Sequence, residues 1–288
     1  MKRLLRWLKY PTLILTALVI AAAFANRVPK LPVPPEITRR TEKLVLQGET
    51  VPVDFFLPRG VEKAPVVIVA HGFSRHRRVM AGWGHLLAQN GMIAVVPNLP
   101  AFSDQGVNIR AIGQLIEIVH EADRLTKPTP TGDVALIGHS AGGFGTLIAA
   151  SREKRARCWI GLDPVDFNDH GLRAIKQLRV PALMLLAESG AWNRHANALA
   201  WLKPATSDIT ALRIRGSTHC DPENPTSLLA RIVCGETDAE RRAVYERYAL
   251  AMLKRHLFDD TAAASVSTDA ARDDSVVVLK PATGAKDE

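Results

Sequence analysis

Cysteine is scarce in this chain, and the spacing of the few present excludes two common uses of the residue. The 288 residues contain three cysteines, Cys158, Cys220 and Cys234. They form neither a C-x-x-C redox motif nor a zinc site. Cys158 lies in an apolar stretch, so we expect a buried, unreactive thiol. Cys220 and Cys234 flank one loop, and in an oxidising compartment we expect them to form a disulfide; the alternative is two unpaired buried thiols.

Long runs of positive charge are also missing, which argues against nucleic acid as a partner. The formal net charge is +8, and half of this excess lies in the basic residues of segment 2–9. The one compact basic cluster beyond that segment is Arg-His-Arg-Arg at residues 75–78. We expect this cluster to be a solvated loop, with the rim of a site that attracts acidic groups as the alternative.

No apolar run is clearly long enough to span a membrane, but residues 1–25 have the layout of an export signal. A basic segment precedes an uncharged apolar run at residues 12–25, which ends in the small-x-small pattern Ala23-Phe24-Ala25. A membrane helix needs about 20 apolar residues. The sequence therefore favours a cleaved signal peptide over an uncleaved inner-membrane anchor, and in both cases predicts an exported domain, periplasmic or secreted. Prolines in residues 26–40 predict a stiff linker.

Between residues 41 and 258, short apolar runs alternate with helical patterns. Strands are expected at residues 41–46, 51–57, 65–70, 92–96, 134–137, 158–162, 180–187 and 212–214, and helices at 80–89, 109–125, after 141, and at 238–257. This alternation predicts an α/β domain with a mostly parallel sheet covered by helices on both faces. From residue 259 onward Ala, Ser, Thr and Asp dominate, so residues 259–288 are expected to be a disordered tail, with one isolated apolar patch at 276–279.

The segment Gly138-His139-Ser140-Ala141-Gly142 follows an apolar run and precedes a helical stretch. A strand, a sharp turn and a helix around G-x-S-x-G are typical of a nucleophile elbow, which strains the serine backbone and exposes its Oγ. The glycines let neighbouring backbone pass closely. Ser140 is therefore the candidate nucleophile; the alternative is a glycine-rich turn without chemistry.

A serine nucleophile needs a histidine to take its proton and an acid to orient that histidine, in the chain order Ser, acid, His. Of the four histidines after Ser140, His219 lies in a loop between the last short strand and the final helix, where such a base is expected. Asp163 and Glu188 each end a predicted strand, at the edge where sites of open α/β sheets form. Asp163 is the preferred acid, Glu188 is the alternative, and Asp166 is expected in a solvated loop.

Two backbone N–H groups must stabilise the oxyanion that forms when an ester carbonyl is attacked. One is expected from Ala141, the residue after the nucleophile, and the other from Phe73 in the loop His71-Gly72-Phe73. His71 is expected to be structural and to bond loop backbone.

Four segments together resemble the α/β-hydrolase superfamily: His71-Gly72-Phe73, the G-x-S-x-G-G motif, Gly161-Leu162-Asp163-Pro164 and the His219 loop. The resemblance covers residues 40–257 and is greatest to the branch of chlorophyllases, platelet-activating-factor acetylhydrolases and cutinase-like polyester hydrolases. In the first two groups the acid follows the strand after the nucleophile, where Asp163 stands. In cutinase-like enzymes it follows the next strand in a Glu-Asn-Asp type segment. Here that segment is Glu188-Ser189-Gly190, so the aspartate is missing.

These residues and the resemblance imply an exported serine esterase that acts through an acyl-enzyme on a small-molecule or lipid-like carboxylic ester. No metal and no organic cofactor is required by this chemistry. A peptidase or an acyltransferase on the same scaffold, or a non-enzymatic anchored binding module, are the alternatives. The sequence does not identify the ester, although Trp83, Trp192 and Phe102 are candidates for an apolar lining.

Overall fold

The structure, a computed structural model, describes residues 27–121, 124–260 and 266–280. The predicted export segment, residues 1–25, lies outside these ranges. In the described part of the chain, no helix combines the length and the apolar character needed to cross a membrane.

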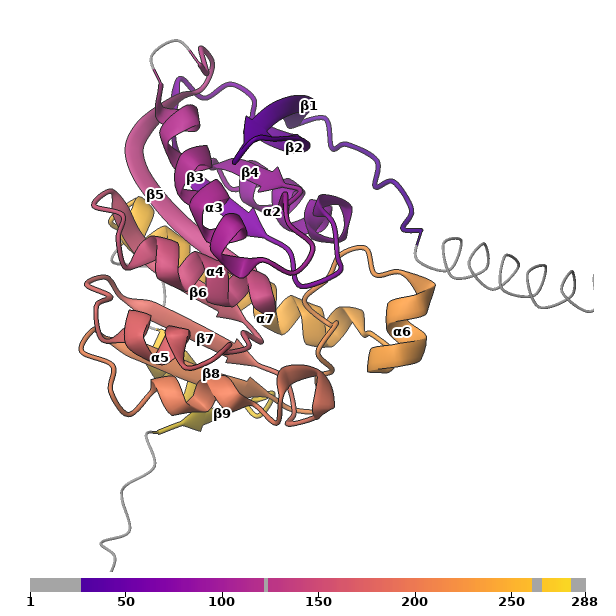
Figure 1. Cartoon of the computed structure of the whole chain (residues 1–288), viewed down its shortest axis with the longest axis vertical. Helices are drawn as coiled ribbons and strands as arrows, with labels where there is room; N and C mark the ends of the chain where they lie inside the picture. Colours follow the sequence, from indigo (N-terminus) through magenta and orange to yellow (C-terminus); the bar gives the residue numbers. More distant parts are fainter. Residues whose placement is uncertain (1–26, 122–123, 261–265, 281–288) are drawn as a thin grey trace, which may run out of the picture.

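The described residues form one nine-stranded sheet in the order β1-β2-β4-β3-β5-β6-β7-β8-β9 (Figure 1). Neighbouring strands from β4 to β8 are parallel, whereas the pairs β1–β2, β2–β4 and β8–β9 are antiparallel. The central strands are continuous apolar runs because both of their faces are covered. The strands are β1 (Ile37–Leu46), β2 (Glu49–Pro58), β3 (Lys63–Ala70), β4 (Ile93–Pro97), β5 (Thr129–His139), β6 (Ala156–Leu162), β7 (Ala182–Leu186), β8 (Ile209–Ile214) and β9 (Val276–Leu279).

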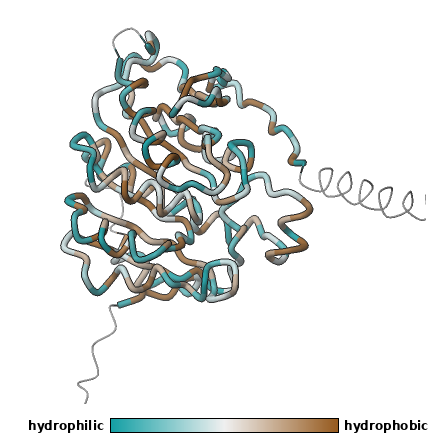
Figure 2. The backbone as a smooth tube through the Cα atoms, in the orientation of Figure 1, coloured by the Kyte–Doolittle hydropathy of each residue, from teal (hydrophilic) through white to brown (hydrophobic). Residues whose placement is uncertain are grey.

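Helices cover both faces of the sheet, as the alternation of elements predicts. One core is built with α3 (Gln105–His120), α4 (Ala141–Ala150) and α5 (His170–Ile175), and the other with α2 (Ala81–Gln89), α7 (Ala239–Leu257) and α8 (Val266–Ala270). Figure 2 shows the hydrophobic residues gathered along the strands and the hydrophilic ones in the outer loops. Short helices η1 (Arg77–Met80), η2 (Ala191–Asn193) and η3 (Asn197–Trp201), together with α6 (Leu228–Cys234), lie in connections between these elements.

The predicted α/β fold is confirmed, and several element boundaries differ by a few residues; two of these differences have a clear physical reason. The helix predicted at residues 109–125 runs from Gln105 to His120, because the Asp104 side chain accepts a hydrogen bond from the Val107 N–H and starts the helix earlier. The first strand begins at Ile37, inside the predicted linker, because the fully buried Ile37 side chain belongs to the core.

The prediction of a disordered tail over residues 259–288 is wrong for the described residues 266–280. Strand β9 pairs with β8 from Ile214–Val276 to Ala211–Leu279, and the Val266 and Val276 side chains are buried. The physical reason is the edge of β8, which would otherwise leave a row of backbone N–H and C=O groups unpaired. A four-residue apolar patch is long enough to pair with residues 211–214 of that edge.

Candidate active site

Ser140 stands in the sharp turn between β5 and α4. Its backbone has φ 55° and ψ −122°, a conformation that costs a non-glycine residue energy and is typical of a nucleophile elbow. The turn is tight enough to demand glycine on both sides. A Cβ on Gly138 would lie 2.2 Å from the Gly142 carbonyl oxygen, and one on Gly142 would lie 2.4 Å from the His71 carbonyl oxygen.

The loop after β8 brings His219 to this turn. The His219 Nε2 lies 3.0 Å from the Ser140 Oγ, and its Nδ1 lies 2.5 Å from the Asp163 Oδ2. The loop is fixed from two sides: the buried His139 ring donates from Nε2 to the His219 carbonyl oxygen at 2.7 Å, and the Ser217 hydroxyl lies 2.9 Å from that of Tyr245 in α7. Three residues predicted as a group are thus in contact, although 79 positions separate Ser140 from His219.

The Asp163 carboxylate is buried at the end of β6 and held by several donors. Oδ1 accepts from the Ala187 backbone N–H at 3.0 Å, and the Asn193 side-chain amide lies 3.2 Å from both carboxylate oxygens. The Asp163 backbone is itself strained, with φ 43°. Asn193 is a site residue that the sequence does not reveal, because no motif or spacing links residue 193 to residue 163.

Glu188, the alternative acid, is directed elsewhere. Its side chain is 46% exposed, accepts from the Gly216 N–H at 3.1 Å and lies 3.5 Å from the Arg213 guanidinium. The carboxylate that reaches His219 is therefore the one predicted first, Asp163.

The electrostatic surroundings give the histidines of the site different proton affinities. Burial acts to lower the pKa of His219, but the hydrogen bond and the charge of Asp163 outweigh it, so the pKa is raised above the ordinary 6.5. Burial and the neighbouring His219 hold the pKa of His139 well below 6.5. Since Asp163 keeps a proton on Nδ1 of His219, the neutral ring presents the bare Nε2 to the Ser140 hydroxyl.

His71 has the structural role predicted for it. Its Nδ1 donates to the Gly72 carbonyl oxygen at 2.9 Å and its Nε2 accepts from the Leu99 N–H at 3.1 Å. Burial lowers its pKa to about 4, which keeps the ring neutral. His71 therefore holds the shape of the loop that carries Phe73.

The two predicted oxyanion donors lie beside Ser140. Ala141 is the first residue of α4, so its N–H is one of the helix's leading donors that have no acceptor within the helix. Phe73 follows Gly72, where a Cβ would come within 3.1 Å of the Ser140 Cβ. No group in the described part of the chain accepts a hydrogen bond from the backbone N–H of Phe73.

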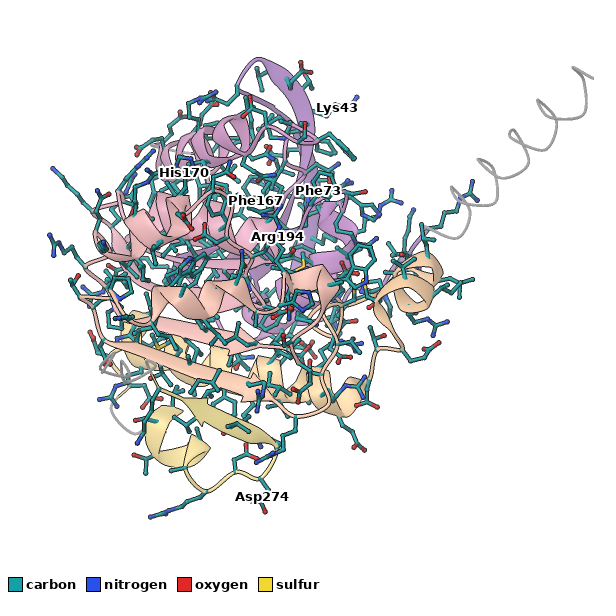
Figure 3. All side chains as sticks on the ribbon, turned by 60° about the horizontal axis from the view of Figure 1, so that its bottom comes forward. Lys43, Phe73, Phe167, His170, Arg194 and Asp274 are labelled. Atoms are coloured by element: carbon teal, nitrogen blue, oxygen red, sulfur yellow. The ribbon has the colours of Figure 1, made fainter. Side chains whose placement is uncertain are left out.

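A cavity of about 680 Å³ opens over Ser140 and His219. Residues of α6 and of the segment around η2 supply much of its apolar wall, namely Ala191, Trp192, Leu229, Ala230 and Val233. The labelled Phe73, Phe167 and Arg194, which belong to this wall, lie close together in Figure 3. The Trp192 indole donates to the Val233 carbonyl oxygen at 2.9 Å and thereby fastens η2 to α6.

Of the aromatic residues expected in the lining, two border cavities and one does not. Trp192 lines the large cavity, and Phe102 lines a smaller one of about 250 Å³ beside it, where its ring lies 4.8 Å from that of Phe73. Trp83 is instead fully buried in the core and donates to the Pro222 carbonyl oxygen at 2.7 Å. Its expected place in a lining is therefore wrong.

The expectation of solvated loops is wrong at two places. Arg75 forms a bidentate pair with the buried Glu223, with both N···O distances 2.6 Å, and Arg77 lies 3.0 Å from the buried Asp54. Asp166 is buried as well and accepts from the Trp201 indole at 2.7 Å and the Gly171 N–H at 2.8 Å. In each case a charge that looks solvated in the sequence meets a partner from a distant segment.

The cysteines differ from expectation in one respect. Cys158 is buried, which raises the pKa of its thiol to about 12 and confirms the prediction of an unreactive residue. Cys220 and Cys234 both line the cavity, but they are free thiols, so the predicted disulfide is wrong. The two thiols share a hydrogen bond, which raises the pKa of Cys220 and lowers that of Cys234.

Comparison with known proteins identifies the family. Residues 66–282, more than two thirds of the chain, match the family described as "Alpha/beta hydrolase family". The chain belongs to this family. Among solved structures, a dienelactone hydrolase from Anabaena variabilis superposes on this α/β hydrolase with a TM-score of 0.61 and 14% identity, over 77% of this chain and 99% of the other. At that identity the superposition supports the fold alone.

Curated relatives of this α/β hydrolase include two with named activities. A bis(hydroxyethyl) terephthalate hydrolase of Streptomyces coelicolor is 23% identical over 199 residues, which cover 68% of this chain and 58% of that hydrolase. A cutinase 2 of Thermobifida cellulosilytica is 23% identical over 212 residues, which cover 72% of this chain and 73% of the cutinase. The chain therefore spans less than two thirds of the length of the first of these relatives.

Proposed function

We propose that this α/β hydrolase cleaves carboxylic esters by nucleophilic catalysis. The observation that carries the proposal is the pair of contacts made by one ring: His219 meets the Asp163 carboxylate through Nδ1 and the Ser140 hydroxyl through Nε2. The names of the curated relatives, a terephthalate ester hydrolase and a cutinase, add support for ester substrates.

In the proposed reaction, His219 Nε2 takes the proton of the Ser140 hydroxyl while Oγ attacks the ester carbonyl carbon. The backbone N–H groups of Phe73 and Ala141 stabilise the negative oxygen that develops. His219 then gives its proton to the leaving alcohol, and the acyl group stays on Ser140. A water, deprotonated by His219, releases the acid and restores the serine. Asp163 stays charged and stabilises the imidazolium at each transfer.

The test combines an ester panel with a variant. Ser140→Ala should lower kcat by about a million-fold, if the loss measured for the serine of subtilisin transfers. Ser151→Ala is the matched control, because the Ser151 hydroxyl bonds the Ile148 carbonyl oxygen at the other end of α4. A fluorophosphonate probe should label the native protein and the control but not Ser140→Ala. Near-native hydrolysis by a folded Ser140→Ala would refute the proposal.

The same panel separates ester hydrolysis from other reactions of this scaffold. Amide substrates test for a peptidase, and alcohol acceptors test for an acyltransferase. A protein that cleaves no substrate and reacts with no probe would be a binding module.

We further propose that the domain is exported by means of residues 1–25. The basic segment, the apolar run and the small-x-small pattern of the sequence support this. Cell fractionation, with N-terminal sequencing of the mature protein, would distinguish a cleaved signal peptide, a membrane-retained segment and a protein that stays in the cytoplasm. The last outcome would contradict export.

A further inference from the structure

Arg194 is a charged residue in the cavity wall that the proposed reaction does not use. It lies between η2 and η3, and its side chain lines the same cavity as Ser140 and His219. In Figure 3 it lies next to Phe167, whose ring it contacts.

The backbone that carries Arg194 is held in an unusual conformation. Arg194, His195 and Ala196 have φ of 50°, 55° and 57°, a left-handed run that is costly for residues other than glycine. Asn193 stabilises it, since its Oδ1 accepts from the N–H groups of Gly190 at 2.9 Å and Ala196 at 3.0 Å. The amide of the same side chain binds the Asp163 carboxylate. The position of Arg194 is therefore tied to the acid beside His219.

The guanidinium group is also oriented, by contacts that leave its charge unpaired. It lies 4.6 Å from the centre of the Phe167 ring, and its Nη1 donates to the Asp166 carbonyl oxygen at 3.3 Å. The Phe167 ring in turn packs edge-on against Phe144 of α4. A guanidinium has five N–H donors. One carbonyl oxygen leaves most of them available in a planar, already oriented fork.

The charges of the cavity wall single out this residue. Arg75 and Glu223, which also line the cavity, form a bidentate pair with each other. Among the ion pairs of the described residues, none joins Arg194 to a carboxylate. The neighbouring wall is apolar, with Val165, Phe167, Leu229 and Val233.

We propose that Arg194 binds an anionic group of the substrate, so that the site selects esters that combine an apolar body with a carboxylate. Bidentate hydrogen bonding to a carboxylate is the arrangement that a guanidinium fork favours. The proposal rests on the proposed ester hydrolysis and names its substrate class, and Arg194 is the residue that determines this specificity.

The experiment compares matched esters in the full chain. Monoethyl esters of dicarboxylic acids of increasing length carry the carboxylate, and ethyl esters of the corresponding half-amides replace it with a neutral group of similar size. The native protein should have the higher kcat/KM for the carboxylate series, with an optimum chain length. In Arg194→Gln the ratio of kcat/KM between the two series should fall about tenfold, mainly through KM, because one charge-assisted hydrogen-bonded pair is lost.

Arg179→Gln is the matched control. Arg179 is exposed and lies just before β7, at the opposite end of the parallel strands from Ser140, so the same loss of charge there should leave the ratio unchanged. Added salt should reduce the preference of the native protein and of Arg179→Gln but not that of Arg194→Gln. Thermal unfolding of each variant verifies that it is folded, and Arg194→Lys, which keeps the charge without the fork, should give an intermediate ratio.

The outcomes separate the two proposals. Equal ratios in the native protein and Arg194→Gln, with both ester series hydrolysed, would overturn the role of Arg194 and leave ester hydrolysis intact. Hydrolysis of neither series would contradict ester hydrolysis, and the inference would fall with it. A third series, with a phosphate in place of the carboxylate, identifies the anion. If the native protein has a higher kcat/KM for the phosphate series than for the carboxylate series and Arg194→Gln abolishes this preference, Arg194 binds an anion and that anion is the phosphate.

Discussion

At the scale of single residues, the contact between His219 and Asp163 controls which ring nitrogen carries the proton. Replacing Asp163 with Asn removes the negative charge and allows the ring to adopt the wrong tautomer. Asp163→Asn should therefore lower kcat by about ten-thousand-fold, as the equivalent change does in trypsin-like triads. Glu188→Gln is the control, because Glu188 contacts Gly216 and Arg213 and not His219. Steady-state kinetics on one neutral ester would measure both, and a larger loss in Glu188→Gln would contradict the assignment of the acid.

The pH dependence of activity follows from the same residue. Burial acts to lower the pKa of His219, but the hydrogen bond and the charge of Asp163 raise it above 6.5. Only the neutral ring accepts the serine proton, so kcat/KM should rise with pH and reach half its maximum above pH 6.5. In Asp163→Asn the carboxylate that raises the pKa of His219 is gone, while the burial that lowers this pKa remains. The residual activity should therefore reach half its maximum at a lower pH. An unchanged midpoint in that variant would show that Asp163 does not set the pKa.

The raised pKa of His219 also makes the stability of the fold depend on pH. A protonated His219 interacts more favourably in the folded than in the unfolded protein, so its contribution is fully present below pH 6.5 and is lost as pH rises through the folded-state pKa. Activity and this part of the stability therefore change in opposite directions with pH.

At the scale of elements, β9 is the part of the fold whose contribution is easiest to isolate. A chain ending at Asp260 lacks α8 and β9, loses the burial of Val266 and Val276 and exposes the edge of β8. Complete burial of one valine side chain contributes roughly 1.5 to 3 kcal/mol. We expect the free energy of unfolding to fall by several kcal/mol by this count and the protein to self-associate through the open edge.

Urea unfolding and light scattering would measure these two effects. A chain ending at Lys280 is the control, since it keeps every element that the structure describes, and its urea midpoint should match that of the full chain. A native midpoint in the chain ending at Asp260 would mean that β9 adds nothing to the domain.

At the scale of the whole molecule, a buried ion pair joins segments that are distant in the sequence. Arg75, in the loop after β3, pairs with Glu223, in the loop that follows His219, 148 positions away. The Gly82 N–H also donates to the Asn224 carbonyl oxygen at 2.7 Å. The halves of the site, the Phe73 loop and the His219 loop, are thereby fastened to each other.

Removing one partner of the Arg75–Glu223 pair should lower the free energy of unfolding more than removing both. Arg75→Met leaves a buried carboxylate without its cation and should lower the free energy of unfolding by about 3 to 5 kcal/mol, whereas the double variant with Glu223→Met should recover most of that loss. Burial already raises the pKa of Glu223. The destabilisation of Arg75→Met should therefore grow with pH, because at higher pH folding must either bury a charged Glu223 carboxylate without its cation or bind a proton to it. Chemical denaturation at several pH values would measure it, and additive losses in the double variant would argue against coupling.

Much of the fold was readable from the sequence because local patterns carry it. Continuous apolar runs predict β3 to β7, and the glycine spacing around Ser140 predicts the elbow, because both depend on residues within a few positions of each other. Asp163 and His219 were also predictable as candidates, since the order of the elements places them at the carboxyl ends of strands. What the local pattern predicts incorrectly is the C-terminal segment, because Val276–Leu279 becomes a strand only where the edge of β8 is available.

The sequence by itself determined the class of fold, the sharp turn at Ser140 and the candidates for nucleophile, base and acid, since these depend on periodicity, glycine placement and chain order. The tertiary structure alone decided which carboxylate reaches His219 and that the Asn193 amide holds this carboxylate. It also decided that Arg75 forms an ion pair whereas Arg194 lies over the Phe167 ring in the cavity wall, and that the thiols of Cys220 and Cys234 are free. The physical reason is distance along the chain. The contacts of Asp163, Arg75 and Arg194 join segments from 27 to 148 positions apart, and only the packing of the whole sheet brings such segments together.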